Sequence, residues 1–369
     1  MSKLQDLSEA GTAVWLDFVD RKFLEQGGLQ QLVDNDGLTG VTSNPTIFEK
    51  AMGAGDAYDA GFAEFDRANP GAAPMARYEA QAIKDIQAAC DTLLPVYQRL
   101  NAADGYVSLE VSPYLALKGP ETAEEAERLW QAVDRPNLMI KIPGTDDGVR
   151  AIRDTIAKGI NVNVTLLFGV EAYKKVAYAY VEGLEERVGK GLPVDKIASV
   201  ASFFVSRIDS KIDDKIDAGV GGEEAKALKG KVAIANAKLA YAWYEEFIAS
   251  ERWQKLAAKG ARPQRLLWAS TGTKNPDYPD TLYVDQLIGP DTVNTMPPKT
   301  MDAFRDHGTV AQTLQQDVDD ARHVIAEQAR LGLDLDAVTK ELVDEGVASF
   351  SKSFDDLLAV IKSKQPAAV

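Results

Sequence analysis

Residues 138–143 read Leu-Met-Ile-Lys-Ile-Pro, a short apolar run that contains one lysine. Successive side chains of a β-strand point to opposite faces, so the leucine and both isoleucines share one face, and Met139 and Lys141 share the other. The first face is entirely apolar, which is typical of a strand covered by helices. The run therefore predicts a buried parallel strand with Lys141 on its inner face.

The two neighbouring apolar runs alternate in the same way. Residues 107–111 read Val-Ser-Leu-Glu-Val, and residues 161–166 read Asn-Val-Asn-Val-Thr-Leu. In both runs the aliphatic residues share one face, toward helices, and the polar residues share the other. The side chains expected to point inward are Ser108, Glu110, Asn161, Asn163 and Thr165.

Eight short apolar runs bounded by turn residues occur along the chain, and helical periodicity separates them. The predicted strands are 13–18, 38–44, 106–111, 138–143, the first half of 160–168, 197–204, 265–270 and 292–296. The clearest predicted helices are 122–132, 148–157, 170–188, 226–247, 310–331 and 337–361. Alternation of this kind predicts a parallel sheet, and eight units predict a closed (β/α)8 TIM barrel, in the α/β class.

The barrel is expected to carry extra helices in two insertions and at its C-terminal end. Residues 45–105 and 206–263 hold more helix than one crossover needs, and about seventy residues follow the eighth strand. No Pro-, Gly- or Ser-rich linker separates these segments. We therefore expect one barrel domain over residues 1–369, with C-terminal helices from about residue 300.

Further polar side chains are expected inside the barrel at the carboxyl ends of other strands. Asp17 is opposite in phase to its apolar neighbours, Asn44 follows the second strand, and Ser202 lies in the sixth. One such residue could be a satisfied polar plug or a solvated strand end. Several that converge on the end where barrels carry out chemistry favour a catalytic site.

Lys141 is the sharpest of these signals. Burial disfavours the charged form of a lysine, and a neutral amine can attack a carbonyl carbon. Glu110 and Asp17 could then supply general acid–base catalysis. The sequence around Gly53 lacks the spacing of a dinucleotide-binding fingerprint, and there is no phosphate-binding P-loop.

Two segments are candidates for binding an anion. Ser206 and Arg207 follow the sixth strand and open a helix, where serine, arginine and backbone N–H groups suit a phosphate. The segment 270–274, Ser-Thr-Gly-Thr-Lys, closes the seventh strand and ends in Lys274. The alternative is a capping serine with a surface cation.

Composition excludes several classes of function. The net charge of −15, from 41 basic and 56 acidic residues, argues against nucleic-acid binding but not against small anionic substrates. The two histidines, His307 and His323, are too few for a multi-histidine metal site. No apolar stretch predicts a membrane span or signal peptide, and the single Cys90 allows no intrachain disulfide, so we expect a cytoplasmic protein.

Four motifs together resemble the transaldolase family, over about residues 14–297. They are Gly-Val-Thr-Ser-Asn-Pro-Thr-Ile-Phe at 40–48, Tyr-Val-Ser-Leu-Glu-Val at 106–111, Met-Ile-Lys-Ile-Pro at 139–143 and Asn-Val-Asn-Val-Thr-Leu-Leu-Phe at 161–168. The loop Ile-Pro-Gly-Thr-Asp-Asp-Gly at 142–148 resembles the longer bacterial members and those fused to a phosphoglucose isomerase. The chain is too short to add that second domain.

The resemblance implies reversible transfer of a dihydroxyacetone unit from sedoheptulose 7-phosphate to glyceraldehyde 3-phosphate, giving erythrose 4-phosphate and fructose 6-phosphate. This is a transferase reaction of the pentose phosphate pathway that uses no cofactor or metal. The partners would be sugar phosphates, and the protein a monomer or homodimer.

The resemblance also implies a role for each candidate site residue. Lys141 forms the Schiff base, and Asp17 is the general acid–base at carbon–carbon cleavage. Glu110 and Thr165 hold a water that carries protons. The substrate-binding residues implied are Asn44 and Asn163 for the dihydroxyacetone unit, Ser202 and Arg207 for the phosphate, and Phe204 for the pocket wall.

The sequence departs from the family pattern at two places. After strand six it reads Ser-Phe-Phe-Val-Ser-Arg at 202–207, where shorter members have Ser-Pro-Phe-Val-Gly-Arg. After strand seven, Lys274 stands where a second phosphate-binding arginine is usual, and lysine binds phosphate without bidentate geometry.

Three rival functions remain open at this point. A related Schiff-base aldolase would release dihydroxyacetone instead of passing it to an acceptor. A non-catalytic sugar-phosphate-binding barrel would pair Lys141 with Glu110 as a buried charge. A pyridoxal-phosphate enzyme would also need a lysine.

Overall fold

The computed structural model describes residues 2–364, and its eight strands close into a parallel barrel in which each strand pairs with its neighbours in chain order. The strands are β1 (Thr12–Leu16), β2 (Gly40–Val41), β3 (Tyr106–Glu110), β4 (Leu138–Pro143), β5 (Val162–Leu167), β6 (Ser199–Phe204), β7 (Arg265–Ala269) and β8 (Thr292–Met296). The predicted (β/α)8 barrel is confirmed.

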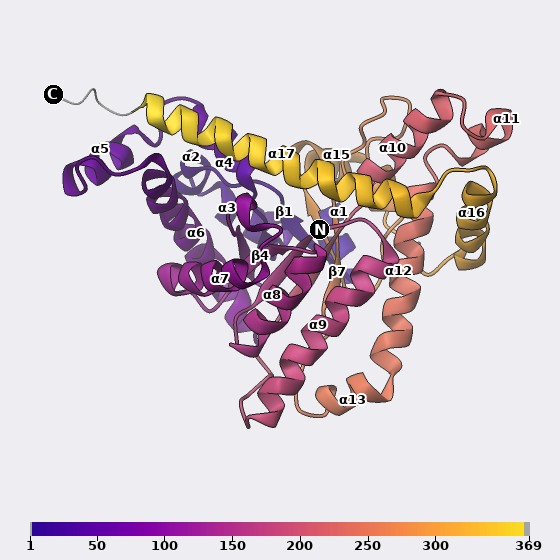
Figure 1. Cartoon of the computed structure of the whole chain (residues 1–369), viewed down its shortest axis with the longest axis horizontal. Helices are drawn as coiled ribbons and strands as arrows, with labels where there is room; N and C mark the ends of the chain where they lie inside the picture. The colour runs from indigo at the N-terminus through magenta and orange to yellow at the C-terminus, as the bar shows by residue number, and fades with distance from the viewer. Residues whose placement is uncertain (1, 365–369) are drawn as a thin grey trace.

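Helices surround the barrel and fill the two insertions (Figure 1). In the first half of the chain they are α1 (Lys3–Glu9), α2 (Arg21–Glu25), α3 (Gly28–Asp36), α4 (Pro45–Gly53), α5 (Asp59–Ala68), α6 (Pro74–Arg99), η1 (Pro113–Leu115), α7 (Gly119–Val133) and α8 (Asp146–Ala157). The rest are α9 (Val170–Gly189), α10 (Ser206–Asp217), α11 (Gly222–Ala225), η2 (Lys226–Leu228), α12 (Val232–Ala249), α13 (Glu251–Ala257), α14 (Leu282–Asp285), α15 (Pro298–His307), α16 (Val318–Arg330) and α17 (Leu335–Ser363).

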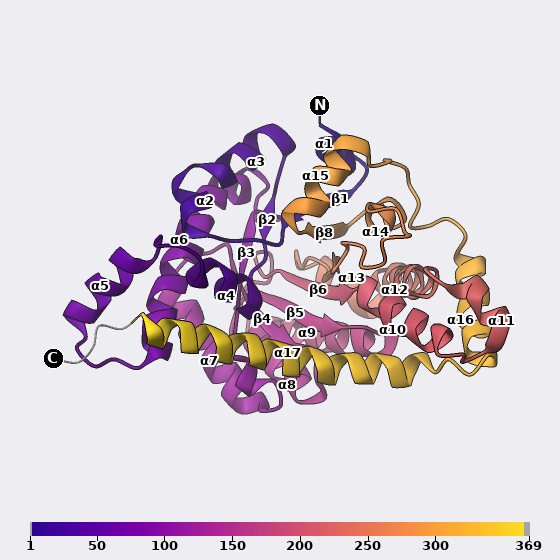
Figure 2. The same cartoon turned by 90° about the horizontal axis from the view of Figure 1, so that it is seen from above.

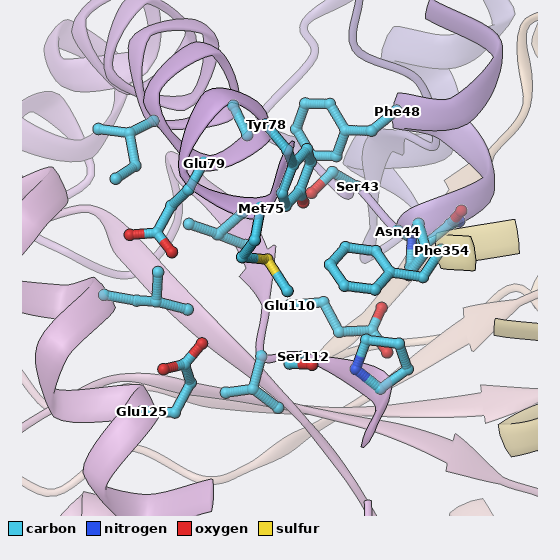
Figure 3. Close-up of a pocket in the computed structure, with 17 residues that line it drawn as sticks. Ser43, Asn44, Phe48, Met75, Tyr78, Glu79, Glu110, Ser112, Glu125 and Phe354 are labelled. Carbon is cyan, nitrogen blue, oxygen red and sulfur yellow. The ribbon is translucent and has the colours of Figure 1, made fainter. Parts of the chain in front are cut away.

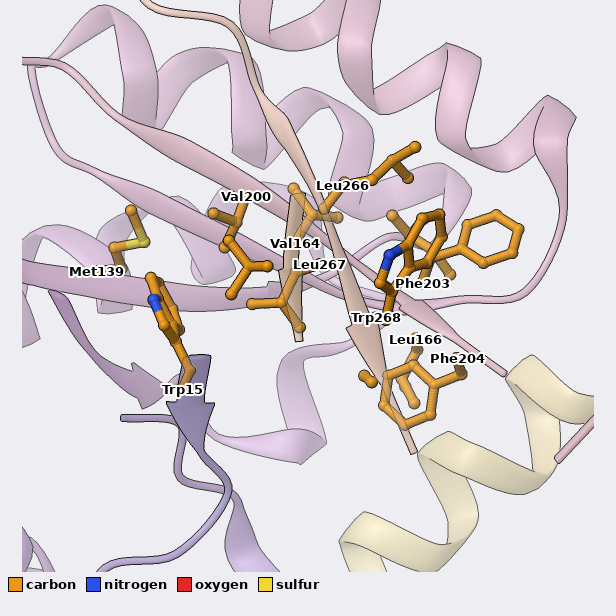
Figure 4. Close-up of a cluster of buried hydrophobic side chains, with 14 of the residues drawn as sticks. Trp15, Met139, Val164, Leu166, Val200, Phe203, Phe204, Leu266, Leu267 and Trp268 are labelled. Carbon is orange, nitrogen blue, oxygen red and sulfur yellow. The ribbon is translucent and has the colours of Figure 1, made fainter. Parts of the chain in front are cut away.

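The strand interiors pack into one buried core. Figure 4 shows side chains from β1, β4, β5, β6 and β7 in a single cluster that includes Trp15, Met139 and Val200. Gly40 is required on β2 because a Cβ atom there would lie 2.2 Å from the Trp15 ring. The indole therefore occupies the space that a β2 side chain would fill, and it plugs the barrel below the carboxyl ends of the strands.

Three predicted elements differ from the observed ones. The second strand has only two residues, because Ser43 and Asn44 leave the ladder: Ser43 donates to the Ser108 carbonyl and Asn44 caps α4. The helix predicted from 226 begins at Val232, after a short 3₁₀ turn. The helix predicted from 310 begins at Val318, because the preceding segment is irregular and Thr313 and Leu314 donate backbone hydrogen bonds to the Ile288 carbonyl.

The C-terminal helix α17 crosses the whole molecule over the open end of the barrel (Figures 1 and 2). One end is held by Arg77 of α6, which is fully buried and donates to the carbonyls of Ile361 and Lys364. The other end is held by Lys211 of α10, which pairs with Glu341 and Glu345. A cation at the end of a helix is favourable because the last carbonyl groups lack partners.

The buried Arg77 generates a prediction about stability. Its guanidinium also pairs with Asp66 at 2.7 Å, so Arg77→Met leaves a carboxylate and two helix-end carbonyls without their donor. We expect the free energy of unfolding in urea to fall by about 3–5 kcal/mol. Arg128→Met is the control. Arg128 pairs with two carboxylates, whereas Arg77 pairs with one, but Arg128 is 48% exposed, so its loss should change stability by less than ~1 kcal/mol. Equal losses of unfolding free energy in the two variants would contradict the role of Arg77 in holding the end of α17.

Candidate active site

An open cavity lies at the carboxyl ends of the strands, under α17. Its walls come from strand ends distant in sequence and from one turn of α17. The lining residues are Asp17, Thr42, Asn44, Lys141, Ser202, Phe204, Arg207, Ala269, Ser270, Gly272, Lys274, Thr295, Pro297 and Phe350. Seven of the ten site residues predicted from sequence therefore line one cavity. The other three, Glu110, Asn163 and Thr165, lie buried on β3 and β5.

Lys141 is held at the floor of this cavity by the register of three strands. Glu110 of β3 pairs with Lys141 of β4, which pairs with Asn163 of β5. The Lys141 ammonium lies 3.4 Å from Glu110 Oε2 and donates to the Ser43 carbonyl at 3.1 Å. Its Nζ also lies 5.9 Å from the centre of the Phe350 ring. The amine is thus buried between one carboxylate and one aromatic ring.

Glu110 borders a second, smaller cavity (Figure 3), which shares Asn44 with the first one. Tyr78 and Met75 of α6 and Phe354 of α17 form much of its apolar wall. Burial raises the pKa of the Glu110 carboxyl and the charge of Asp17 raises it further, whereas Lys141 lowers it. Within residues 2–364 neither carboxyl oxygen has a hydrogen-bond partner, and neither has the Thr165 hydroxyl. Both groups therefore have free capacity to bind a proton-carrying ligand.

Asp17 faces the cations of the cavity. Its carboxyl is desolvated by the surrounding protein, which raises its pKa, and Lys141, Thr42, Arg207 and Lys274 lower it. The hydroxyl of Thr42 donates to Asp17 Oδ1 at 2.7 Å. A carboxyl group whose pKa is raised by burial and lowered by neighbouring cations is suited to exchanging a proton with a ligand.

A chain of hydrogen bonds fixes Asn163 across the interior. Ser202 donates to Asn163 Oδ1 at 2.7 Å, and Asn163 Nδ2 donates to Ser108 Oγ at 2.9 Å. Asn163 and Ser108 confirm the predicted inward face. Asn161 does not join the site, since it precedes β5 and its amide binds backbone groups at the other end of the barrel, including the Leu138 carbonyl.

Asn44 and Phe204 each have a structural contact as well as a place on the cavity wall. Asn44 caps α4, because its Oδ1 accepts from the Ile47 N–H at 3.0 Å. The ring of Phe204 lies 5.1 Å below the Arg207 guanidinium. Both residues are therefore oriented before any ligand binds.

Arg207 and Lys274 form a cationic wall without a protein counter-ion. Arg207 is in the first turn of α10, and Lys274 lies at the exposed rim in the loop after β7. Burial lowers the pKa of both groups, and Arg207 lowers that of Lys274 further. Neither forms an ion pair or side-chain hydrogen bond with any residue between 2 and 364. Two neighbouring unpaired cations, one of them in the first turn of a helix, are suited to binding an anion.

The sequence did not predict the contribution of α17 to the cavity. Phe350 and Phe354 lie on a helix whose periodicity was evident, but nothing local indicates where a C-terminal helix docks. Thr295 and Ser270 also line the cavity, and both lie within the predicted strands 292–296 and 265–270. Their position at the carboxyl ends of β8 and β7 was the available signal.

The remaining candidates lie elsewhere. His307 is exposed and contacts Asp280 and Asp306, His323 lies on α16, and Cys90 is buried on α6. Among the residues that the structure describes, no three His, Cys, Asp or Glu side chains are grouped to hold a metal ion. No helix in the described part is long and apolar enough to cross a membrane.

Comparisons with known proteins agree with this geometry. Residues 14–361 match the family described as transaldolase/fructose-6-phosphate aldolase. The protein named transaldolase of Frankia alni is 50% identical, with 97% of this chain and 96% of that protein covered. Those of Thiobacillus denitrificans and Mycobacterium tuberculosis are 49% and 47% identical, with 98% and 96% of this chain and 100% and 95% of the relatives covered.

The unpaired cations generate a prediction about anion binding. Arg207→Ala should weaken the binding of inorganic phosphate, measured by calorimetry, by about tenfold or more, because a charge-assisted hydrogen bond is worth ~1.5–3 kcal/mol. Arg150→Ala, on the exposed surface of α8, is the control and should leave phosphate binding unchanged. Wild-type affinity in the Arg207 variant would rule out this anion site.

Proposed function

The chain belongs to the transaldolase/fructose-6-phosphate aldolase family, and we propose that it is a transaldolase that transfers a dihydroxyacetone unit between sugar phosphates through a Schiff base on Lys141. The donor is sedoheptulose 7-phosphate and the acceptor glyceraldehyde 3-phosphate, and the products are erythrose 4-phosphate and fructose 6-phosphate. The observation that carries the proposal is the Lys141 amine, buried 3.4 Å from Glu110 on the floor of a cavity with a cationic wall.

The first step forms the Schiff base. The Lys141 amine attacks the ketose carbonyl, the carbonyl oxygen leaves as water, and a protonated imine forms. Glu110 is the nearest carboxyl to Nζ, and with Thr165 it has free hydrogen-bonding capacity. These two residues bind the water that carries protons during imine formation and hydrolysis. Burial raises the pKa of the Glu110 carboxyl, which favours its taking up those protons.

The second step breaks a carbon–carbon bond. Asp17 removes the proton from the hydroxyl on the carbon that becomes the aldehyde, the carbon–carbon bond breaks as that aldehyde leaves, and the bonding electrons enter the imine to give an enamine. Addition of the enamine to the acceptor aldehyde reverses these movements, and Asp17 returns the proton. The imine is the electron sink, so the proposed reaction needs no metal or cofactor.

Binding of the substrate uses the remaining residues of the cavity. Asn163, fixed by Ser108 and Ser202, and Asn44 orient the dihydroxyacetone unit. Arg207 binds the phosphate together with Ser202, and Phe204 forms the wall beneath the guanidinium. Lys274 adds a second positive charge at the rim.

Other properties belong to the same proposal. The chain forms one barrel domain over residues 1–369, of which residue 1 and the last five lie outside the described part. It acts in the cytoplasm as a monomer or homodimer, in the pentose phosphate pathway. The net charge of −15 supports the absence of nucleic-acid binding.

The alternative within the family is an aldolase that releases dihydroxyacetone. The buried Phe350 on α17 lies over Lys141 and favours transfer, because an apolar cover limits the water that could protonate the enamine. With fructose 6-phosphate and no acceptor, a transaldolase releases about one glyceraldehyde 3-phosphate per active site, and an aldolase turns over repeatedly. We expect the single burst, and continuous release of dihydroxyacetone would establish the aldolase.

The Schiff-base assignment predicts that Lys141→Met abolishes transfer without unfolding the barrel, because the methionine has no amine. The measurement is a transfer assay alongside circular dichroism. Lys238→Met is a matched control, since Lys238 is also buried but lies on α12 and donates to the Gln316 carbonyl. We expect it to retain transfer. A Lys141 variant that transfers at the wild-type rate would refute the mechanism.

A further inference from the structure

Two threonine hydroxyls form a chain that ends on the carboxylate of Asp17. Thr42 Oγ1 lies 2.7 Å from Asp17 Oδ1 and 2.7 Å from Thr295 Oγ1. The threonine side chains are buried, with 1% and 3% of their surface exposed. All three residues come from adjacent positions in the closed barrel, because β1 pairs with both β2 and β8.

The backbone holds this chain in place. The N–H of Asp17 donates to the Met296 carbonyl at 2.8 Å, and the N–H of Thr42 donates to the Leu16 carbonyl at 2.9 Å. In the ladder, Trp15 is opposite both Gly40 and Thr295. The hydroxyls therefore meet Asp17 through barrel closure itself, and not through a mobile loop.

Counting protons fixes the direction of the chain. A hydroxyl carries one proton, and an ionised carboxylate only accepts. While Asp17 is ionised, Thr42 must donate to Oδ1, so the proton between the two threonines must come from Thr295. The Thr295 hydroxyl lines the cavity and is then only an acceptor toward a ligand.

The other oxygen of Asp17 has a different environment. No hydrogen bond within residues 2–364 uses Oδ2, and Asp17 lines the cavity. A donor already occupies Oδ1, so a proton arriving from a ligand goes to Oδ2.

We propose that Thr42 and Thr295 are positioning residues for catalysis: their hydroxyl chain holds Oδ1 as an acceptor and leaves Oδ2 as the oxygen that exchanges the proton with the substrate hydroxyl. The inference rests on the proposed function, in which Asp17 is the general acid–base. It adds two residues to which neither the family resemblance nor the comparisons assign a role.

The charges that face Asp17 set the expected pH dependence. Lys141 from β4, Arg207 from α10 and Lys274 from the loop after β7 all favour its ionised form, and the carboxyl of Glu110 on β3 opposes it. The hydrogen bond from Thr42 adds to the first group and lowers the pKa of Asp17. Without that bond the pKa rises, and the acidic limb of the rate–pH profile moves to higher pH.

The test compares Thr42→Val, Thr295→Val and Thr295→Ser with the wild type. The readouts are kcat and KM for transfer from pH 5 to 9, and the mass that borohydride traps from fructose 6-phosphate. We expect Thr42→Val to lower kcat by about tenfold and to move the acidic limb to higher pH, because a hydrogen bond to a charged group is worth about that factor. Thr295→Val should lower kcat and move the acidic limb to higher pH by smaller amounts. Thr295→Ser keeps the hydroxyl, so its rate–pH profile should match that of the wild type.

Thr292→Val is the matched control for the loss of one buried hydroxyl. Thr292 and Thr12 form a similar threonine pair, 2.9 Å apart, at the opposite end of β8 and β1. This variant should change thermal stability at most, and its pH profile should match that of the wild type.

Each outcome decides one point. Thr42→Val and Thr295→Val variants that fold and keep the wild-type pH profile would overturn the inference, as would a Thr295→Ser variant no better than Thr295→Val. The total amount of three-carbon and six-carbon adduct trapped on Lys141 should be unchanged in all four variants, because the chain acts after the imine has formed. Failure of the proposed function is distinguishable, since the wild type itself would then trap no mass, or Asp17→Asn would still cleave fructose 6-phosphate.

Discussion

The site depends on the register between neighbouring strands of a closed barrel. Pairing of β3, β4 and β5 sets Glu110, Lys141 and Asn163 side by side, and pairing of β1 with β2 and β8 brings Asp17 to Thr42 and Thr295. A shift of one residue would turn each of these side chains to the outer face. The apolar outer faces therefore specify the positions of the polar groups inside, because they leave the strands a single favourable register.

Charge balance explains how so many ionisable groups share one interior. The Lys141 ammonium faces Glu110, and Asp17 faces the cations, so no buried charge is isolated from an opposite one. Arg207 and Lys274 lie within reach of the Asp17 charge, but no side chain in the described residues forms an ion pair or hydrogen bond with them. That surplus of positive charge, on a protein whose net charge is −15, localises the attraction for an anionic ligand to the mouth of the cavity.

The sequence predicted the barrel, and seven of the ten candidate residues that it indicated line one cavity, for a physical reason. Alternation of side chains along buried strands sorts polar from apolar residues, so Glu110, Lys141 and Asn163 could be assigned to the interior without a structure. Alternation ends where the strand ends, so the two-residue β2 and the cap formed by Asn44 were not predicted. Long-range docking has no local signal either. Phe350 reaches Lys141 because α17 docks across the barrel, where Arg77 and Lys211 contact its two ends.

In the proposed reaction Lys141, and no other lysine, forms a covalent imine with the donor sugar. The most direct measurement is incubation of the wild-type protein with fructose 6-phosphate, reduction with sodium borohydride, and mass spectrometry of the intact chain and its peptides. We predict one three-carbon or six-carbon adduct, on the peptide that contains Lys141. A folded protein that carries no adduct, or carries it on another lysine, would contradict Schiff-base formation at Lys141.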